Sequence, residues 1–81
     1  MKVSVEMSYY PLNTSFIPKI KDFIDRLNQY PALTVNTNTM STQVFGEYRE
    51  VMEILTKEIE ASFENPHSVF VMKIINADLK P

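Results

Sequence analysis

The sequence predicts a single α+β domain in which a four-stranded antiparallel sheet carries two helices on one face. Two observations support this prediction. Short stretches alternate apolar and polar residues or are apolar throughout, as strands are, and two longer stretches repeat apolar residues every three or four positions, as helices do. The elements follow in the order strand, helix, strand, strand, helix, strand, which is typical of the ferredoxin-like βαββαβ sandwich. With 81 residues the chain is expected to form one domain, residues 1–81.

The first strand is expected over about residues 2–9, because every second residue there is apolar, namely Val3, Val5 and Met7. Pro11 should end this strand, since proline lacks an amide hydrogen and restricts the residue before it. A helix is then expected from a cap at Thr14 or Ser15 to about Gln29. Its apolar residues recur at helical spacing: Phe16, Ile17, Ile20, Phe23, Ile24 and Leu27.

The second half of the chain places a hairpin before its helix. Alternation predicts a strand over residues 33–38, a turn within residues 38–41 and a third strand over residues 42–45. Gly46 is expected to supply a strained backbone angle where the helix begins. That helix should span about residues 47–63, with Glu58 largely outside an apolar stripe of Val51, Met52, Leu55, Ile59 and Phe63. The last strand, residues 68–76, is apolar on both faces.

Composition excludes several classes of function. The chain is 44% hydrophobic and 22% charged, with a net charge of −2, which argues against a nucleic-acid groove and against an anionic membrane surface. It has no cysteine, and the lone His67 cannot form a multi-histidine metal site. No apolar run approaches the roughly 20 residues of a membrane span, so we expect a cytoplasmic protein without membrane insertion. No grouping of catalytic residues is recognisable, so we expect no enzyme, metal ion or cofactor.

Strand alternation also sorts the polar residues. If Val3, Val5 and Met7 point at the helices, then Glu6, Ser8, Asn36 and Asn38 point to the helix-free face of the sheet. The last strand adds an apolar strip to that face whichever of its residues point outward, for example Phe70, Met72 and Ile74. Because such a strip rarely stays exposed in a small monomer, we expect a homodimer or homotetramer.

Each candidate binding residue has a simpler alternative. Glu6 can accept hydrogen bonds from a ligand amino group, or it can be a solvated carboxylate that discourages unwanted sheet pairing. Tyr9 can stack on a flat ring or pack in the core. The densest cluster offers the donors and acceptors that a pyrimidine edge requires, but the same residue types also satisfy their own backbone in hairpins. This cluster comprises Asn36, Asn38, Thr39, Ser41 and Thr42.

Two stretches resemble the YkoF-like family of thiamine- and hydroxymethylpyrimidine-binding proteins and its sister group of small thiamine-binding proteins. They are Val5-Glu6-Met7-Ser8-Tyr9-Tyr10-Pro11-Leu12 and Met40-Ser41-Thr42-Gln43-Val44-Phe45-Gly46-Glu47-Tyr48. The resemblance implies a non-catalytic ferredoxin-like domain that associates through its sheets and binds thiamine or its hydroxymethylpyrimidine part. Matching motif positions would place these residues near the ligand: Glu6, Ser8, Tyr9, Asn38, Ser41, Thr42 and Phe45.

Some members of that family carry two such units in one chain, whereas this chain carries one, so a composite site would require a homo-oligomer. We therefore expect a thiamine-type ligand to bind the helix-free face at a subunit interface, with no nucleic-acid partner. The alternative is an oligomeric protein-interaction or regulatory module with no small-molecule ligand. An enzyme subunit whose chemistry comes from a partner chain is the third possibility.

Overall fold

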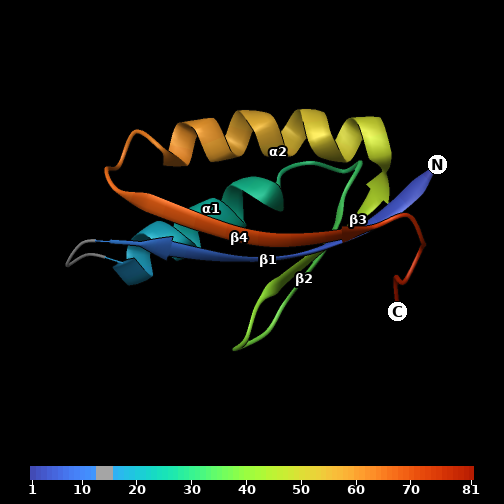
Figure 1. Ribbon diagram of the computed structural model, residues 1–81, viewed down its shortest axis with the longest axis horizontal. Coiled ribbons are helices and arrows are strands. Elements are labelled where there is room, and N and C mark those ends of the chain that lie inside the picture. The colour runs from blue at the N-terminus through green and yellow to red at the C-terminus, as the bar shows by residue number, and fades with distance from the viewer. Residues whose placement is uncertain (13–15) are drawn as a thin grey trace.

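The computed structural model describes residues 1–12 and 16–81, and it confirms the predicted α+β architecture. The sheet is antiparallel with the strand order β2-β3-β1-β4, and both helices lie on one side of it (Figure 1). The expected helix cap at Thr14 or Ser15 lies outside the described residues. The elements are β1 (Lys2–Pro11), α1 (Phe16–Leu27), β2 (Thr34–Thr37), β3 (Thr42–Glu47), α2 (Tyr48–Ser62) and β4 (Ser68–Ile75).

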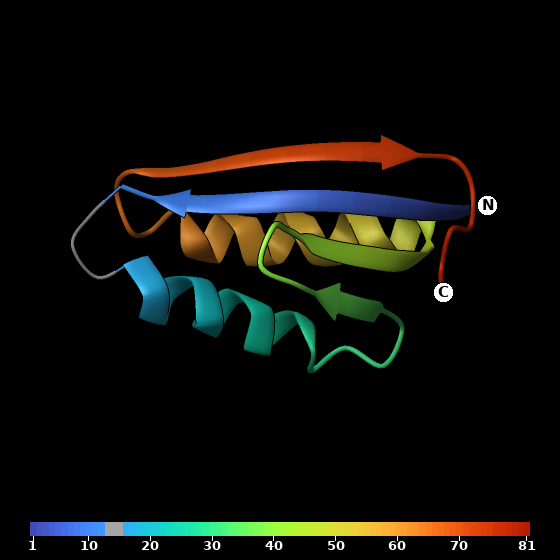
Figure 2. The same cartoon turned by 90° about the horizontal axis from the view of Figure 1, so that it is seen from below.

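Strand β1 occupies the centre of the sheet, and its two neighbours cover different parts of it. It pairs with β3 from Lys2 to Met7 and with β4 from Ser4 to Pro11. Beyond Met7, therefore, β1 has a partner on one side only. Figure 2 shows this stagger, with the β2–β3 hairpin beside one half of β1 and α1 beyond the other half.

The first strand is two residues longer than expected, because β1 continues past Tyr9 and ends at Pro11, which pairs with Ser68. The Leu12 amide donates to the His67 carbonyl at 2.8 Å. The amides and carbonyls of even-numbered residues in this stretch therefore point toward β4. Backbone groups alternate sides along a strand, and those of Pro11 therefore face the side where β3 has already ended. Because Pro11 has no strand beside it on that side, its missing amide hydrogen costs the sheet no hydrogen bond.

The core lies between the sheet and the two helices. It is built from Val3, Val5 and Met7 of β1 together with Phe23, Leu27, Val44, Val51 and Leu55, all at most 2% exposed, and Tyr9 adds its ring at 8% exposure. Ile17 was expected to belong to the apolar stripe of α1 but is exposed. The face suggested for the last strand is also wrong. Phe70, Met72 and Ile74 lie opposite Tyr9, Met7 and Val5, so they face the helices.

Gly46 does not adopt the strained backbone conformation that was expected, since its φ is not positive. A Cβ at this position would instead lie 3.1 Å from the carbonyl oxygen of Ala32 and 3.1 Å from Cγ2 of Val51. Glycine is favoured here because a side chain would push against the loop before β2 and the first turns of α2.

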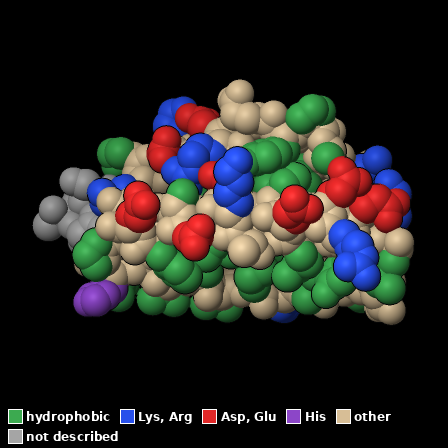
Figure 3. All heavy atoms as spheres, turned by 90° about the horizontal axis from the view of Figure 1, so that it is seen from above, with side chains coloured by type: hydrophobic (Ala, Val, Ile, Leu, Met, Phe, Trp, Pro, Cys, Tyr) green, Lys and Arg blue, Asp and Glu red, His purple; other side chains and the backbone are tan. Residues whose placement is uncertain are grey.

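The two helices are joined by a polar cluster in which Glu58 is the central acceptor. Glu58 was expected outside the apolar stripe, but it is only 6% exposed. Arg26 Nε donates to Glu58 Oε1 at 2.8 Å, and the Tyr30 hydroxyl donates to Oε2 at 2.5 Å. Arg26 also donates to the Ser62 hydroxyl at 2.8 Å. On the outer surface of the helices, charged side chains of both signs are interspersed (Figure 3).

We predict that Glu58→Gln destabilises the fold by about 2 kcal/mol at pH 7, because it leaves Arg26 without its buried counter-charge. Burial by itself raises the pKa of Glu58, but the hydrogen bonds from Tyr30 and Arg26 outweigh burial and leave that pKa below its usual value. A depressed pKa stabilises the fold above the usual carboxyl pKa of about 4.3, and this stability is lost as the pH falls through the folded value.

Urea unfolding at pH 7 and pH 3.5 measures both effects. The wild type should lose more stability on acidification than Glu58→Gln does. Glu60→Gln, an exposed carboxylate on the same helix, is the matched control and should behave like the wild type. Equal stability of Glu58→Gln and Glu60→Gln at pH 7 would contradict the proposed role of the cluster.

Candidate functional site

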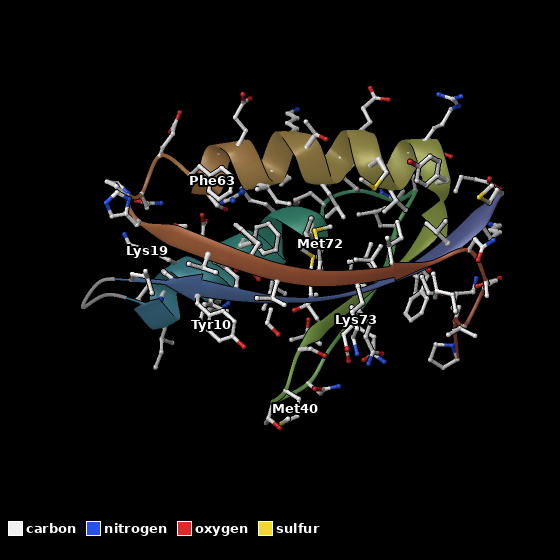
Figure 4. All side chains as sticks on the ribbon, in the orientation of Figure 1. Tyr10, Lys19, Met40, Phe63, Met72 and Lys73 are labelled. Atoms are coloured by element: carbon white, nitrogen blue, oxygen red, sulfur yellow. The ribbon has the colours of Figure 1, made fainter. Side chains whose placement is uncertain are left out.

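A row of four polar side chains crosses the helix-free face of the sheet, one from each strand. Glu6 of β1 lies opposite Lys73 of β4 on one side and opposite Gln43 of β3 on the other. Asn36 of β2 lies opposite Gln43 and completes the row. Directly opposed residues of an antiparallel sheet point to the same face, which here is the face without helices. Figure 4 shows Lys73 and Tyr10 on this side and Met72 on the other.

Glu6 is held in place from two directions. Lys73 Nζ lies 2.8 Å from Glu6 Oε1, and the Ser41 hydroxyl donates to Glu6 Oε2 at 3.1 Å. The hydrogen bonds from Lys73 and then Ser41, with the charge of Lys73 in addition, lower the pKa of Glu6. The same pair raises the pKa of Lys73. Both groups are therefore fully charged near neutral pH, and the carboxylate presents acceptor oxygens in a fixed position.

A hollow of about 670 Å³, which we call the face hollow, lies beside Glu6 on this face. Its polar lining is Ser4, Glu6, Gln43 and Lys73, and its outward apolar side chains are Phe45, Ile75 and Leu79. Val5 and Ile74 also border it, although their side chains face the helices. Ser4 and Phe45 are only 6% and 5% exposed, although they lie opposite each other on the helix-free face. The segment after β4 accounts for the burial of Ser4, because it turns back over this end of the sheet and bonds to the Ser4 hydroxyl.

A second hollow of about 440 Å³, the edge hollow, occupies the place where β1 continues without β3. It is lined by residues 7–12, by Ile20, Phe23 and Ile24 of α1, and by residues 37–42 at the tip of the hairpin. The hydrogen bond from Ser41 to Glu6 links the two linings, since Glu6 lines the face hollow and Ser41 the edge hollow. Most of the edge hollow's lining is apolar, with hydroxyl and amide groups at the hairpin.

The structure brings the predicted site residues together in two groups. Glu6 and Phe45 line the face hollow, and the edge hollow is lined by Ser8, Tyr9, Asn38, Ser41 and Thr42. Asn36 is exposed in the polar row and lines neither hollow.

Three of these residues have clear structural roles. Tyr9 is buried, stacks on Phe70 with ring centroids 4.4 Å apart, and meets Phe23 edge-on, so its ring belongs to the core. Thr42 lies opposite Met7 and thus faces the helices. Asn38 Oδ1 accepts from the amides of Met40 and Ser41 at 2.8 and 3.1 Å. This is the turn chemistry that was weighed as the alternative, and it leaves only the amide nitrogen of Asn38 for other partners.

Several residues that line the face hollow were not predicted as site residues, among them Gln43, Lys73 and Leu79. Gln43 and Lys73 stand in the polar row only because of the register on either side of β1, and register is not visible in a single strand. One signal was available for Lys73, since it is the only charged residue of an otherwise apolar strand. Leu79 lies beyond the last strand, where no periodicity applies.

The arrangement suits the non-covalent binding of a small polar molecule with an apolar side. Within residues 1–12 and 16–81, no three histidine, aspartate or glutamate side chains are grouped so that they could hold a metal ion. None of the helices in that part of the chain is long and apolar enough to cross a membrane.

Comparison with known proteins relates this chain to solved structures only. No protein-family model matches it, and no curated protein matches it either. A protein of Streptococcus pneumoniae superposes with a TM-score of 0.87 at 24% identity, covering 98% of this chain and 90% of the other. A hypothetical protein of Methanocaldococcus jannaschii gives 0.80 at 26% identity, covering 99% and 84%.

A third solved structure carries a functional description. It is a candidate thiamine biosynthesis or salvage protein of Thermotoga maritima, with a TM-score of 0.82 at 19% identity, covering 99% of this chain and 85% of the other. A domain of unknown function from Bacillus cereus is also similar, with a TM-score of 0.72 at 16% identity. At these identities the comparisons establish a shared ferredoxin-like fold, and the reference to thiamine belongs to the Thermotoga protein.

We predict that Lys73→Met raises the pKa of Glu6 toward its usual value, because Lys73 provides the largest part of the present depression. The hydrogen bond from the Ser41 hydroxyl remains in this variant, so the pKa of Glu6 should stay somewhat below its usual value. Titration of the Glu6 side-chain carboxyl carbon by NMR measures the pKa directly. Lys57→Met, which removes a cation from α2, is the control and should leave Glu6 unchanged. An identical Glu6 titration in Lys73→Met and wild type would show that the two side chains are not paired in solution.

Proposed function

We propose that this protein binds a small planar ligand of the thiamine type, thiamine or its hydroxymethylpyrimidine part, on the helix-free face of its sheet, without chemical conversion. The observation that carries the proposal is the fixed carboxylate of Glu6 beside a partly apolar hollow of about 670 Å³, which falls within the range of ligand pockets. The family resemblance and the description of the Thermotoga protein support the same ligand class.

The groups of the face hollow match the chemistry of an aminopyrimidine. An exocyclic amino group would donate to the Glu6 carboxylate, and the Gln43 amide offers both a donor and an acceptor to ring nitrogens or a hydroxymethyl group. Phe45 and Ile75 provide apolar contacts for a flat ring. The positive ring of thiamine would compete with Lys73 for Glu6, and the displaced ammonium can return to water because Lys73 is 81% exposed.

Calorimetric titration with thiamine and with hydroxymethylpyrimidine tests this function. We predict that the wild type binds at least one of them and that Glu6→Gln weakens binding about ten-fold or more, as expected for a lost hydrogen bond to a charged group. Glu60→Gln on the surface of α2 is the charge-matched control and should bind like the wild type. Binding of neither compound at millimolar concentration would refute the proposal, and equal affinity of Glu6→Gln would remove Glu6 from the site.

We further propose that the protein assembles as a homodimer or homotetramer and that the ligand site lies at a subunit interface. The outward residues Tyr10, Val69, Val71 and Ile75 form an apolar strip, and each is between 41% and 57% exposed. Lys73 separates Val71 from Ile75 along the edge strand β4, and both Lys73 and Ile75 line the face hollow. A second copy that covered the strip would therefore also lie against the ligand site.

We predict that Val71→Lys shifts the protein toward monomer, because a second subunit would have to bury the added charge against an apolar surface. Light scattering coupled to size-exclusion chromatography measures the mass. Ile17→Lys, at an exposed apolar position on α1, is the control and should not change it. A wild type that is already monomeric at high micromolar concentration would contradict the assembly.

The same strip favours a second candidate function, an oligomeric interaction module without a small ligand. The titrations separate the two functions, because the module would assemble through the strip and give no heat with either compound.

A further inference from the structure

The segment after β4, residues 76–81, lies across the helix-free side of the sheet, on the opposite side from the helices (Figure 1). We call this segment the strap. Among the residues that the structure describes, Ser4 provides the side-chain hydrogen bonds that join it to the sheet. The Ser4 hydroxyl donates to the Ala77 carbonyl at 2.7 Å and accepts from the Leu79 amide at 2.8 Å. Ser4 thereby uses its one donor and one of its acceptor sites on the strap, and it is almost fully buried.

The strap places one apolar side chain at the face hollow. Leu79 lines this hollow together with Phe45 and Ile75, yet it remains 61% exposed. Ser4, whose hydroxyl accepts from the Leu79 amide, lies two residues from Glu6 on the same face of β1, a separation of about 7 Å along the strand. A ligand with a second ring would extend farther along the strand toward Leu79 than a single ring held at Glu6.

We propose that Leu79, positioned by Ser4, is a specificity-determining residue that favours a two-ring ligand over its single-ring part in the face hollow. This inference rests on the proposed function and adds a size criterion to it. The second ring would cover the exposed surface of Leu79, and the gain comes from apolar surface removed from water. Ser4 acts through Leu79 as a positioning residue, because its two hydrogen bonds order the strap before the ligand arrives.

The test compares the affinities of thiamine and hydroxymethylpyrimidine for each variant by calorimetry. Leu79→Ala should weaken thiamine binding about five-fold and hydroxymethylpyrimidine binding less than two-fold, since only the larger ligand reaches the strap. Ser4→Ala should reproduce this selective loss, and Ser4→Thr should restore it, because threonine retains the hydroxyl and is well tolerated in strands. Thr34→Ala is the matched control, an exposed hydroxyl on the same face that does not line the hollow.

Hydrogen exchange of the Leu79 amide provides a readout that needs no ligand. In the wild type this amide should exchange more slowly than in an unstructured peptide, and Ser4→Ala should remove the protection while leaving the amides of β1 protected. An unprotected Leu79 amide in the wild type would overturn the inference. So would unchanged thiamine affinity in both Leu79→Ala and Ser4→Ala. Failure of the wild type to bind either compound would instead refute the proposed function, whatever the exchange rate of Leu79.

Discussion

The rest of the structure depends on the pairing of β1 with two neighbours that cover different parts of it. Because β1 is central, its alternation decides which residues face the helices on both adjoining strands. Val3, Val5 and Met7 are buried on one face, and Ser4, Glu6 and Ser8 are thereby fixed on the other. The unequal ladders add a second consequence. β4 follows β1 to Pro11 but β3 begins only opposite Met7, and this difference opens the edge hollow.

Most of the fold could be predicted from periodicity, since alternation and helical spacing each depend on one segment at a time. The errors occurred where a second segment decides the outcome. β4 is apolar on both faces, so only its register against Tyr9 and Met7 selects Phe70 and Met72 for the core. Pro11 remains in β1 because its neighbour on one side has ended. Glu58 looks like a surface residue within its own helix, and it is buried because Arg26 and Tyr30 of another segment meet it there.

The candidate site was predictable to a similar degree. Glu6 and Asn36 were assigned to the helix-free face from alternation, and the register places both in the polar row. Tyr9 was a stacking candidate by residue type, but its position among the buried residues of β1 directs its ring into the core. Gln43 and Lys73 join Glu6 through pairings between strands, and Ser4 reaches residues 77 and 79 through a reversal of the chain. Local sequence carries little information on contacts over such separations.

The charge balance of the face hollow indicates how such a site can select a ligand. Glu6 and Lys73 neutralise each other, so the hollow does not attract ions of either sign strongly, and recognition depends on hydrogen-bond geometry and apolar contact. The pair is solvent-exposed, and exposed ion pairs are worth only about 0–1 kcal/mol. A ligand that donates a hydrogen bond to Glu6 therefore loses little binding free energy by displacing Lys73. Until then Lys73 and Ser41 favour one orientation of the carboxylate, so part of the ordering of Glu6 precedes ligand binding.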